Sequence, residues 1–161
     1  MKRIIAPVLF AVVFFLAGVI SAGNKTAWQK PQTRVGNEVE FLNPEGRAGA
    51  PFSEAVRVGK LLILSGQLGR DPKTGALAAG GVGAETRQAL ENIKVTLERY
   101  GSSLSRVVKC TVMLADIDER DGMNKVYMEY FNKNRPARSA FGAGGLAMGA
   151  RVEIECWAVV D

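Results

Sequence analysis

The sequence has 161 residues and a formal net charge of +5, and it contains no histidine. Histidine is the commonest general base and the commonest metal ligand, and the 2 cysteines lack the Cys-x-x-Cys spacing of zinc sites. We therefore expect no metal cofactor. The basic residues are spread along the chain without a dense block, which argues against nucleic acid as a partner, because its binding needs a patch that neutralises several phosphates at once.

The N-terminal residues have the pattern of a secretory signal peptide. Lys2 and Arg3 precede seventeen uncharged, mostly apolar residues at positions 4–20, and small residues come next. We expect cleavage after Ala22 or Gly23, and a periplasmic or secreted protein with no stable membrane association. The alternative is an uncleaved anchor, because an apolar stretch of this length is at the lower limit for a membrane span.

Residues 23–37 are polar and have no sustained periodicity, so we interpret them as a leader that follows the signal peptide, residues 1–22. The folded domain is expected over residues 38–161, a length that suffices for one hydrophobic core. The sequence of this domain contains no internal repeat.

The first part of the domain is predicted to be β structure. Residues 39–42 form a short edge strand in this interpretation. Residues 55–58 and 61–65 are expected to form a hairpin whose two-residue turn contains Gly59. The run Asp-Pro-Lys-Thr-Gly at 71–75 is a strong turn signal.

An amphipathic helix is predicted over residues 85–100. Its apolar residues recur at the spacing of one helical face: Leu90, Ile93, Leu97 and Tyr100. Gly101 follows as a stop signal.

The next element is predicted to be a strand over residues 107–114. Alternation places Val108, Cys110, Val112 and Leu114 on one apolar face. Cys110 and Cys156 both fall on apolar strand faces, so we interpret them as small buried apolar residues. The sequence leaves undecided whether the two cysteines form a disulfide, which an oxidising compartment would permit.

A second helix is predicted after Asp116 or Asp118, either of which can cap it. Its apolar residues recur at helical spacing: Met123, Val126, Tyr127, Tyr130 and Phe131. Asn124 lies beside this stripe, where a core residue is usually apolar. Pro136 closes the helix, and the chain is expected to enter a strand at Arg138.

The last strand, from Val152 to Val160, alternates between an apolar face and a face that carries Glu153, Glu155 and Trp157. Arg138 and these carboxylates flank a glycine-rich run at 142–149, an arrangement that favours an anion site.

The element order predicts an α+β fold, a mixed sheet with two helices on one face. The other face carries Glu153, Glu155, Trp157, Thr111 and Met113 and is too apolar to face water, so we expect a second copy of the chain to pack there in a cyclic oligomer.

Nine short motifs between residues 38 and 161 match a known family in order and spacing: Phe41-Leu42-Asn43-Pro44, Ala50-Pro51-Phe52-Ser53-Glu54-Ala55-Val56, Leu64-Ser65-Gly66-Gln67, Asp71-Pro72-Lys73-Thr74-Gly75, Gln88-Ala89-Leu90-Glu91-Asn92, Val108-Lys109-Cys110-Thr111-Val112, Met123-Asn124-Lys125-Val126-Tyr127, Pro136-Ala137-Arg138-Ser139 and Val152-Glu153-Ile154-Glu155. With them the chain resembles the RidA/YjgF family of reactive-intermediate deaminases, also known as endoribonuclease L-PSP. The resemblance implies a chorismate-mutase-like sheet and a homotrimer with a site in each cleft between subunits.

The activity implied by the resemblance is hydrolysis of enamines and imines derived from 2-amino acids, such as 2-aminoacrylate, to 2-keto acids and ammonia without any cofactor. Arg138 matches the arginine that binds the substrate carboxylate, and Glu153 matches the residue that positions water. Ser65 and Asn124 match polar lining positions. A planar guanidinium can hold a carboxylate at two points, and a carboxylate can act as general base where histidine is absent.

Each assignment has a structural alternative. Arg138 and Glu153 can form an interfacial salt bridge, Ser65 can bond local backbone, and Asn124 can point to solvent. The chain departs from the family at Phe52, where tyrosine is common, and at Ala140, where cysteine is common. These departures and the export signal support a second hypothesis, a non-catalytic ligand-binding or chaperone-like trimer. A ribonuclease, suggested by the older family name, has the weakest support.

Overall fold

The computed structural model describes residues 38–44 and 51–161, which lie within one unit of the chain, Arg34–Asp161. The expected signal peptide, residues 1–22, and the leader, residues 23–37, lie outside the described residues. Within the described ranges, no helix is long and apolar enough to cross a membrane.

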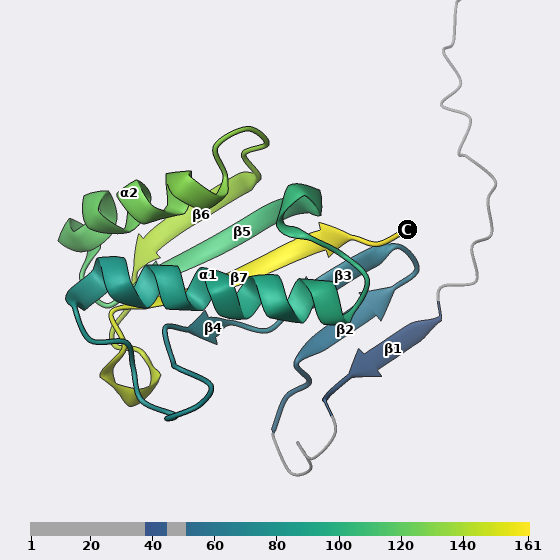
Figure 1. Ribbon diagram of the computed structural model, residues 1–161, viewed down its shortest axis with the longest axis horizontal. Coiled ribbons are helices and arrows are strands. Elements are labelled where there is room, and N and C mark those ends of the chain that lie inside the picture. Colours follow the sequence, from purple (N-terminus) through teal and green to yellow (C-terminus); the bar gives the residue numbers. More distant parts are fainter. Residues whose placement is uncertain (1–37, 45–50) are drawn as a thin grey trace, which may run out of the picture. The chain divides into compact units, whose positions relative to one another are not determined.

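A mixed sheet forms the centre of the fold (Figure 1). Its strands are β1 (Val39–Leu42), β2 (Ala55–Val58), β3 (Leu61–Leu64), β4 (Gln67–Leu68), β5 (Val107–Leu114), β6 (Ala137–Gly142) and β7 (Val152–Val159). Across the sheet the order is β1-β2-β3-β7-β5-β6, and β4 pairs with β7. The pair β5–β6 is parallel, and the others are antiparallel. A parallel pair needs a crossover, and the second helix supplies it.

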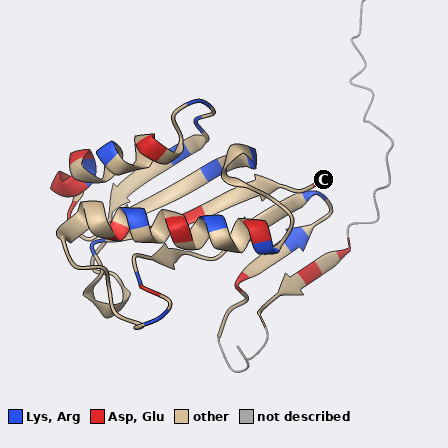
Figure 2. Cartoon of the chain, viewed as in Figure 1, with Lys and Arg blue, Asp and Glu red and all other residues tan. Residues whose placement is uncertain are grey.

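The helices α1 (Gly81–Arg99) and α2 (Arg120–Tyr130) pack side by side on one face of the sheet (Figure 1), as predicted. Short 3₁₀ helices span Leu104–Arg106, Ile117–Glu119 and Ala147–Gly149. Figure 2 shows basic and acidic residues interspersed along both α-helices.

The helix α1 begins at Gly81, four residues before its predicted start at residue 85. Glycine has low helix propensity, so the sequence pattern does not show this first turn. Tertiary packing explains the turn, because a Cβ atom on Gly122 of α2 would come within 2.9 Å of Val82. The close approach of the two helices holds the glycine-rich turn in place.

The core lies between the sheet and the helices, and the predicted apolar faces form it. The side chains of Leu90, Ile93 and Leu97 on α1 are fully buried, and so are those of Val152 and Ile154 on β7. On α2, the predicted stripe is buried except for the half-buried Tyr130.

The prediction for Val108 is wrong. Val108 is 45% exposed, whereas Val107 is 5% exposed and packs in the core. The pairing of β5 with β7 shifts between Val107 and Lys109. This β-bulge inserts one residue and reverses the alternation for the start of the strand, an effect that depends on the partner strand.

Cys110 of β5 and Cys156 of β7 lie directly opposite each other and form a disulfide, with their Cα atoms 4.2 Å apart. Both residues are fully buried, as expected, but they are not the unpaired thiols of the preferred interpretation. Alternation within each strand predicts which face a cysteine occupies, while the register between strands decides whether two cysteines meet.

The capping prediction at Asp116 needs a correction. The Asp116 side chain accepts a hydrogen bond from the backbone N–H of Asp118 at 3.0 Å, and it caps the 3₁₀ helix Ile117–Glu119. The helix α2 begins only after this extra turn, at Arg120.

Candidate active site

Glu153 lies in β7 on the face of the sheet opposite the helices. It pairs with Met113 of β5 and Leu68 of β4, and it is half-buried. Its carboxylate lies against the backbone of Gly66, where a Cβ atom would come within 2.8 Å of the Glu153 Cδ atom. A glycine at this position is what leaves room for the carboxylate.

The surroundings of Glu153 raise the pKa of its carboxyl group above the ordinary value of 4.5. Burial is the main cause, and the neighbouring Glu155 carboxylate adds to it. Glu155 accepts a hydrogen bond from the Thr111 hydroxyl at 3.3 Å. A carboxylate with a raised pKa is a stronger base, which suits it to take a proton from water.

Ser65 follows β3 and directly precedes Gly66, so it lies close to Glu153. Its hydroxyl donates a hydrogen bond to the Ser53 carbonyl at 2.6 Å, and its backbone N–H donates to the Glu54 carbonyl at 3.0 Å. These are the local backbone hydrogen bonds that were given as the structural alternative for Ser65. The hydroxyl oxygen keeps lone pairs with which it can accept a hydrogen bond.

Arg138 lies on the other side of the sheet, in the edge strand β6, which begins at Ala137, one residue before the predicted entry. It pairs with Cys110 of β5, and its guanidinium faces α2. The guanidinium carbon lies 4.7 Å from the centre of the Tyr127 ring, and Nη1 lies 4.0 Å from the sulfur of Met123. The aromatic ring and the thioether thus support the side chain.

Tyr127 is 5% exposed, and its hydroxyl makes no hydrogen bond to any described residue. Burial raises the pKa of Tyr127 to about 12, and the positive charge of Arg138 opposes part of this shift. The phenol therefore stays neutral at physiological pH and presents the face of its ring to the guanidinium.

Asn124 lies in α2 next to Met123 and is half-buried. The structure thus places Asn124 and Arg138 on the helix side of the sheet, and Ser65 and Glu153 around Gly66.

Arg138 and Glu153 are not brought together within one subunit. Their β5 neighbours, Cys110 and Met113, are three residues apart, so the two side chains point to opposite faces. Among the ion pairs of the described residues, none joins Arg138 to Glu153.

The open face of the sheet carries a continuous apolar row. The register of β1, β2, β3 and β7 aligns Phe41, Val56, Ile63 and Trp157 across four strands. Phe41 is 72% exposed and Trp157 is 37% exposed. The predicted set of Thr111, Met113, Glu153, Glu155 and Trp157 shares this face. A surface of this kind is typical of a protein interface.

The chain matches the family model described as Endoribonuclease L-PSP over residues 44–160. The chain belongs to this family. It is the RidA/YjgF family that the nine motifs resemble.

Among its RidA/YjgF relatives, the human protein named 2-iminobutanoate/2-iminopropanoate deaminase is 44% identical over 109 residues, which cover 68% of this chain and 80% of the relative. The bovine protein of the same name is 48% identical over the same shares. A RutC family protein of Pyrococcus horikoshii is 42% identical over 118 residues, which cover 73% of this chain and 94% of the relative.

Solved structures of the family have the same α+β fold. The YjgF gene product of E. coli matches with a TM-score of 0.69 and 34% identity, covering 74% of this chain and 98% of that one. An Entamoeba histolytica protein described as a putative endoribonuclease L-PSP matches with a TM-score of 0.70 and 38% identity, covering 76% and 100%.

Three residues that contact the candidate residues of this RidA/YjgF chain were not predicted as site residues from the sequence. Met123 and Tyr127 were predicted only as core residues, although their i, i+4 spacing places both on one helical face where they can flank Arg138. Gly66 offers a weak signal, since an isolated glycine at a strand end often marks a close approach of another group. The identity of that group follows only from the β4–β7 pairing.

Proposed function

We propose that this protein is a cofactor-independent deaminase. It hydrolyses the C=N bond of small imines derived from 2-amino acids, with their enamine tautomers, to 2-keto acids and ammonia. The observation that carries the proposal is the Glu153 carboxylate, held against Gly66 with a raised pKa. The names of the human and bovine relatives, at 44% and 48% identity, support the same chemistry.

In this mechanism Glu153 acts as general base. It takes a proton from a water molecule whose oxygen adds to the imine carbon, so a C–O bond forms while the C=N double bond becomes single. That proton passes to the nitrogen and gives a carbinolamine. The proton of the new hydroxyl group then also moves to the nitrogen, the C–N bond breaks, and ammonia departs while the hydroxyl oxygen becomes the carbonyl oxygen of the keto acid. Water is the other reactant, and no oxidant or reductant is consumed.

Arg138 holds the carboxylate of the substrate in this proposal. The Tyr127 ring lies against the Arg138 guanidinium, whose planar fork of N–H groups can reach both oxygens of a carboxylate. Two contact points fix the direction of the adjacent C=N bond. We assign Ser65 and Asn124 as polar contacts to substrate or water.

We further propose that the site lies between two subunits of a homotrimer. Arg138 and Glu153 point to opposite faces of one subunit's sheet, so a common site needs each from a different copy. The exposed apolar row from Phe41 to Trp157 supports self-association, because burying it removes aromatic and aliphatic surface from water.

The test is a panel of imines generated in the assay, 2-aminoacrylate among them, with keto-acid formation as the readout. We expect the Arg138→Ala variant to lose about 100-fold or more in kcat/KM, and Glu153→Gln to lose about 100-fold in kcat. Arg120→Ala is the matched control, since Arg120 is an exposed arginine of α2. Equal rates for the wild type and Arg138→Ala would rule out the proposed clamp.

The same assay separates the deaminase from the alternatives. Ligand binding without turnover, lost in Arg138→Ala, favours a non-catalytic binding module. We do not propose RNA cleavage, because the chain has no histidine and its basic residues are interspersed with acidic ones along the helices (Figure 2).

We separately propose that the protein is exported from the cytoplasm. This proposal rests on the N-terminal sequence pattern alone. Its test is the first residue of the protein recovered from its host cells. A chain that begins at residue 23 or 24 supports cleavage, and an intact N-terminus contradicts it.

A further inference from the structure

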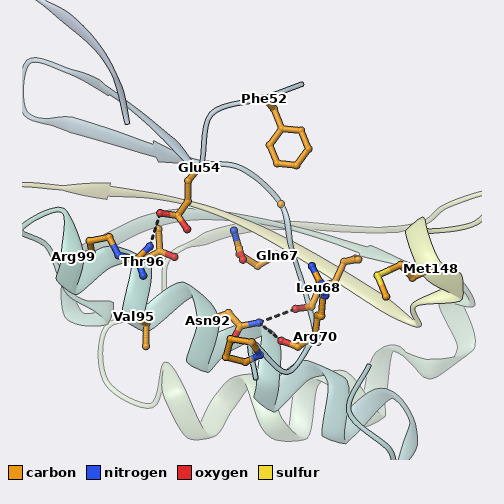
Figure 3. Close-up of a pocket in the computed structure, with 12 residues that line it drawn as sticks. Phe52, Glu54, Gln67, Leu68, Arg70, Asn92, Val95, Thr96, Arg99 and Met148 are labelled. Carbon is orange, nitrogen blue, oxygen red and sulfur yellow. Dashed lines mark hydrogen bonds and ion pairs between the residues drawn. The ribbon is translucent and has the colours of Figure 1, made fainter. Parts of the chain in front are cut away.

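A second concave site lies on the helix side of the sheet, away from Arg138. The cavity has a volume of about 480 Å³ and lies between the segment after Pro51, the strand β4 and the helix α1 (Figure 3). The helix contributes a stripe at i, i+3, i+4 and i+7, from Asn92 to Arg99. The volume is within the range of about 300–1,000 Å³ that is typical of small-molecule sites.

One end of the cavity is occupied by an ion pair between Glu54 and Arg99. Glu54 accepts hydrogen bonds from Arg99 at 2.6 Å and from the Tyr100 hydroxyl at 2.8 Å. In Figure 3 Glu54 and Arg99 lie on one side of the cavity and Arg70 lies on the other, with Gln67 between them. Among the described residues that line the cavity, Arg70 is the charged side chain outside this ion pair.

The guanidinium of Arg70 is held in place by the turn that follows it. Its Nε donates to the Gly75 carbonyl at 2.7 Å, and the turn is closed by a bond from the Asp71 N–H to the Ala76 carbonyl at 2.8 Å. Gly75 has φ 76°, and a Cβ atom there would come within 2.9 Å of Nη2 of Arg70. A glycine at position 75 thus allows both the positive φ of the turn and the close approach of the Arg70 guanidinium.

Both terminal amino groups of Arg70 remain without a hydrogen bond to the described part of the chain. A guanidinium bonded through Nε presents its two Nη groups as a planar edge that fits the two oxygens of a carboxylate. Asn92 cannot compete for this role, because its amide already donates to the carbonyls of Leu68 and Arg70.

Apolar side chains also line the cavity. Leu68 and Met148 lie on the side of Arg70, whereas Val95 lies nearer Arg99 (Figure 3), and the Gln67 side chain adds one amide group. Met148 has φ 61°, a left-handed conformation that is uncommon outside glycine, and it brings a 60% exposed thioether side chain to the rim.

We propose that this cavity binds a small monocarboxylate, with its carboxylate on Arg70 and its apolar part against Leu68, Val95 and Met148. The proposal goes beyond the deaminase function, because neither Arg138 nor Glu153 lines the cavity. The cavity shares Gly66 with the Glu153 site, so an occupant lies next to the backbone on which that carboxylate rests.

The test is a titration of the full-length protein with hexanoate, followed by the amide chemical shifts of residues 66–70 and 92–96. Hexanamide is the uncharged comparison of equal length. We expect hexanoate to shift these signals in the wild type and in Arg138→Ala, and to bind about tenfold or more weakly to Arg70→Ala. Arg120→Ala, which removes an exposed arginine outside the cavity, is expected to bind like the wild type.

A second pair of variants tests the volume rather than the charge. Val95→Phe fills the cavity and is expected to weaken hexanoate binding, while Lys94→Phe, one residue away on the exposed side of α1, leaves it unchanged. Equal binding by Arg70→Ala and the wild type overturns the proposal. So does the absence of shifts, or binding that maps to Tyr127 and disappears in Arg138→Ala.

Discussion

Glu153 owes its raised pKa to two causes that can be separated by mutation. Burial is the larger, and the charge of Glu155 is the smaller. The proposed general base works in its deprotonated form, so we expect activity to rise with pH through the pKa of Glu153, which is raised above the ordinary value of 4.5.

The first prediction concerns this acid limb. In Glu155→Gln the like charge is gone, so the pKa of Glu153 falls and the limb of kcat moves to lower pH. Glu91→Gln, on α1, serves as the control and leaves the limb in place. A limb that moves upward in Glu155→Gln contradicts the assignment of Glu153 as base.

The second prediction concerns Gly66. A methyl group there overlaps the Glu153 carboxylate, so Gly66→Ala displaces the base and lowers kcat by about tenfold or more, with little change in KM. Gly144→Ala is the matched control, because a Cβ atom on Gly144 meets nothing within 4 Å. Steady-state kinetics of both variants decide the matter, and unchanged kcat in Gly66→Ala refutes this role.

The third prediction separates the ring of Tyr127 from its hydroxyl. Tyr127→Leu removes the aromatic face beneath Arg138 and is expected to raise KM by about threefold to tenfold. Tyr127→Phe keeps the face and removes a buried hydroxyl without a partner, so KM stays the same and the free energy of unfolding is unchanged or about 1 kcal/mol higher. An equal rise in KM for both variants would point to a role for the hydroxyl instead.

At the scale of elements, the β5–β7 pair holds the centre of the sheet. It contains the β-bulge at Val107 and Lys109 and the disulfide between Cys110 and Cys156. The disulfide joins residues 46 positions apart and is fully buried beneath the helices.

The fourth prediction follows from that cross-link. Closing a loop of this length restricts the unfolded chain, so unfolding under reducing conditions is expected to cost about 2–4 kcal/mol less than under oxidising conditions. The double variant Cys110→Ala/Cys156→Ala is the control, and its unfolding midpoint should not respond to the reductant. A wild-type midpoint that is equally insensitive contradicts a role of the disulfide in stability.

At the scale of the whole molecule, a single subunit separates the two proposed halves of the active site. Arg138 lies on the helix side of the edge strand β6, and Glu153 lies on the open face beside β4. In the proposed mechanism both groups act on one substrate, which requires that several copies assemble.

The fifth prediction is complementation between two inactive variants. If each site takes Arg138 from one subunit and Glu153 from another, mixed trimers of Arg138→Ala and Glu153→Gln contain intact sites, and equal mixing restores roughly a quarter of wild-type activity. Subunits mixed without exchange remain inactive and provide the control. Inactive mixed trimers refute a shared site, and a monomer in sedimentation refutes the assembly itself.

Most of the elements, and most of the faces that they bury, can be predicted from local sequence patterns. Alternation from Val152 to Val160 and the helical spacing of Leu90, Ile93 and Leu97 are local patterns, and each follows from burying one face of one element. The motifs around Arg138 and Glu153 likewise predicted the family and the candidate residues.

The contacts between elements cannot be predicted in the same way. The bulge at Val107, the disulfide partner of Cys110 and the contact of Gly66 with Glu153 depend on strand register, which no single strand encodes. The same holds for the faces that Arg138 and Glu153 occupy relative to each other. A side chain's face is a local property, whereas its neighbours come from distant segments whose packing is selected by the fold as a whole.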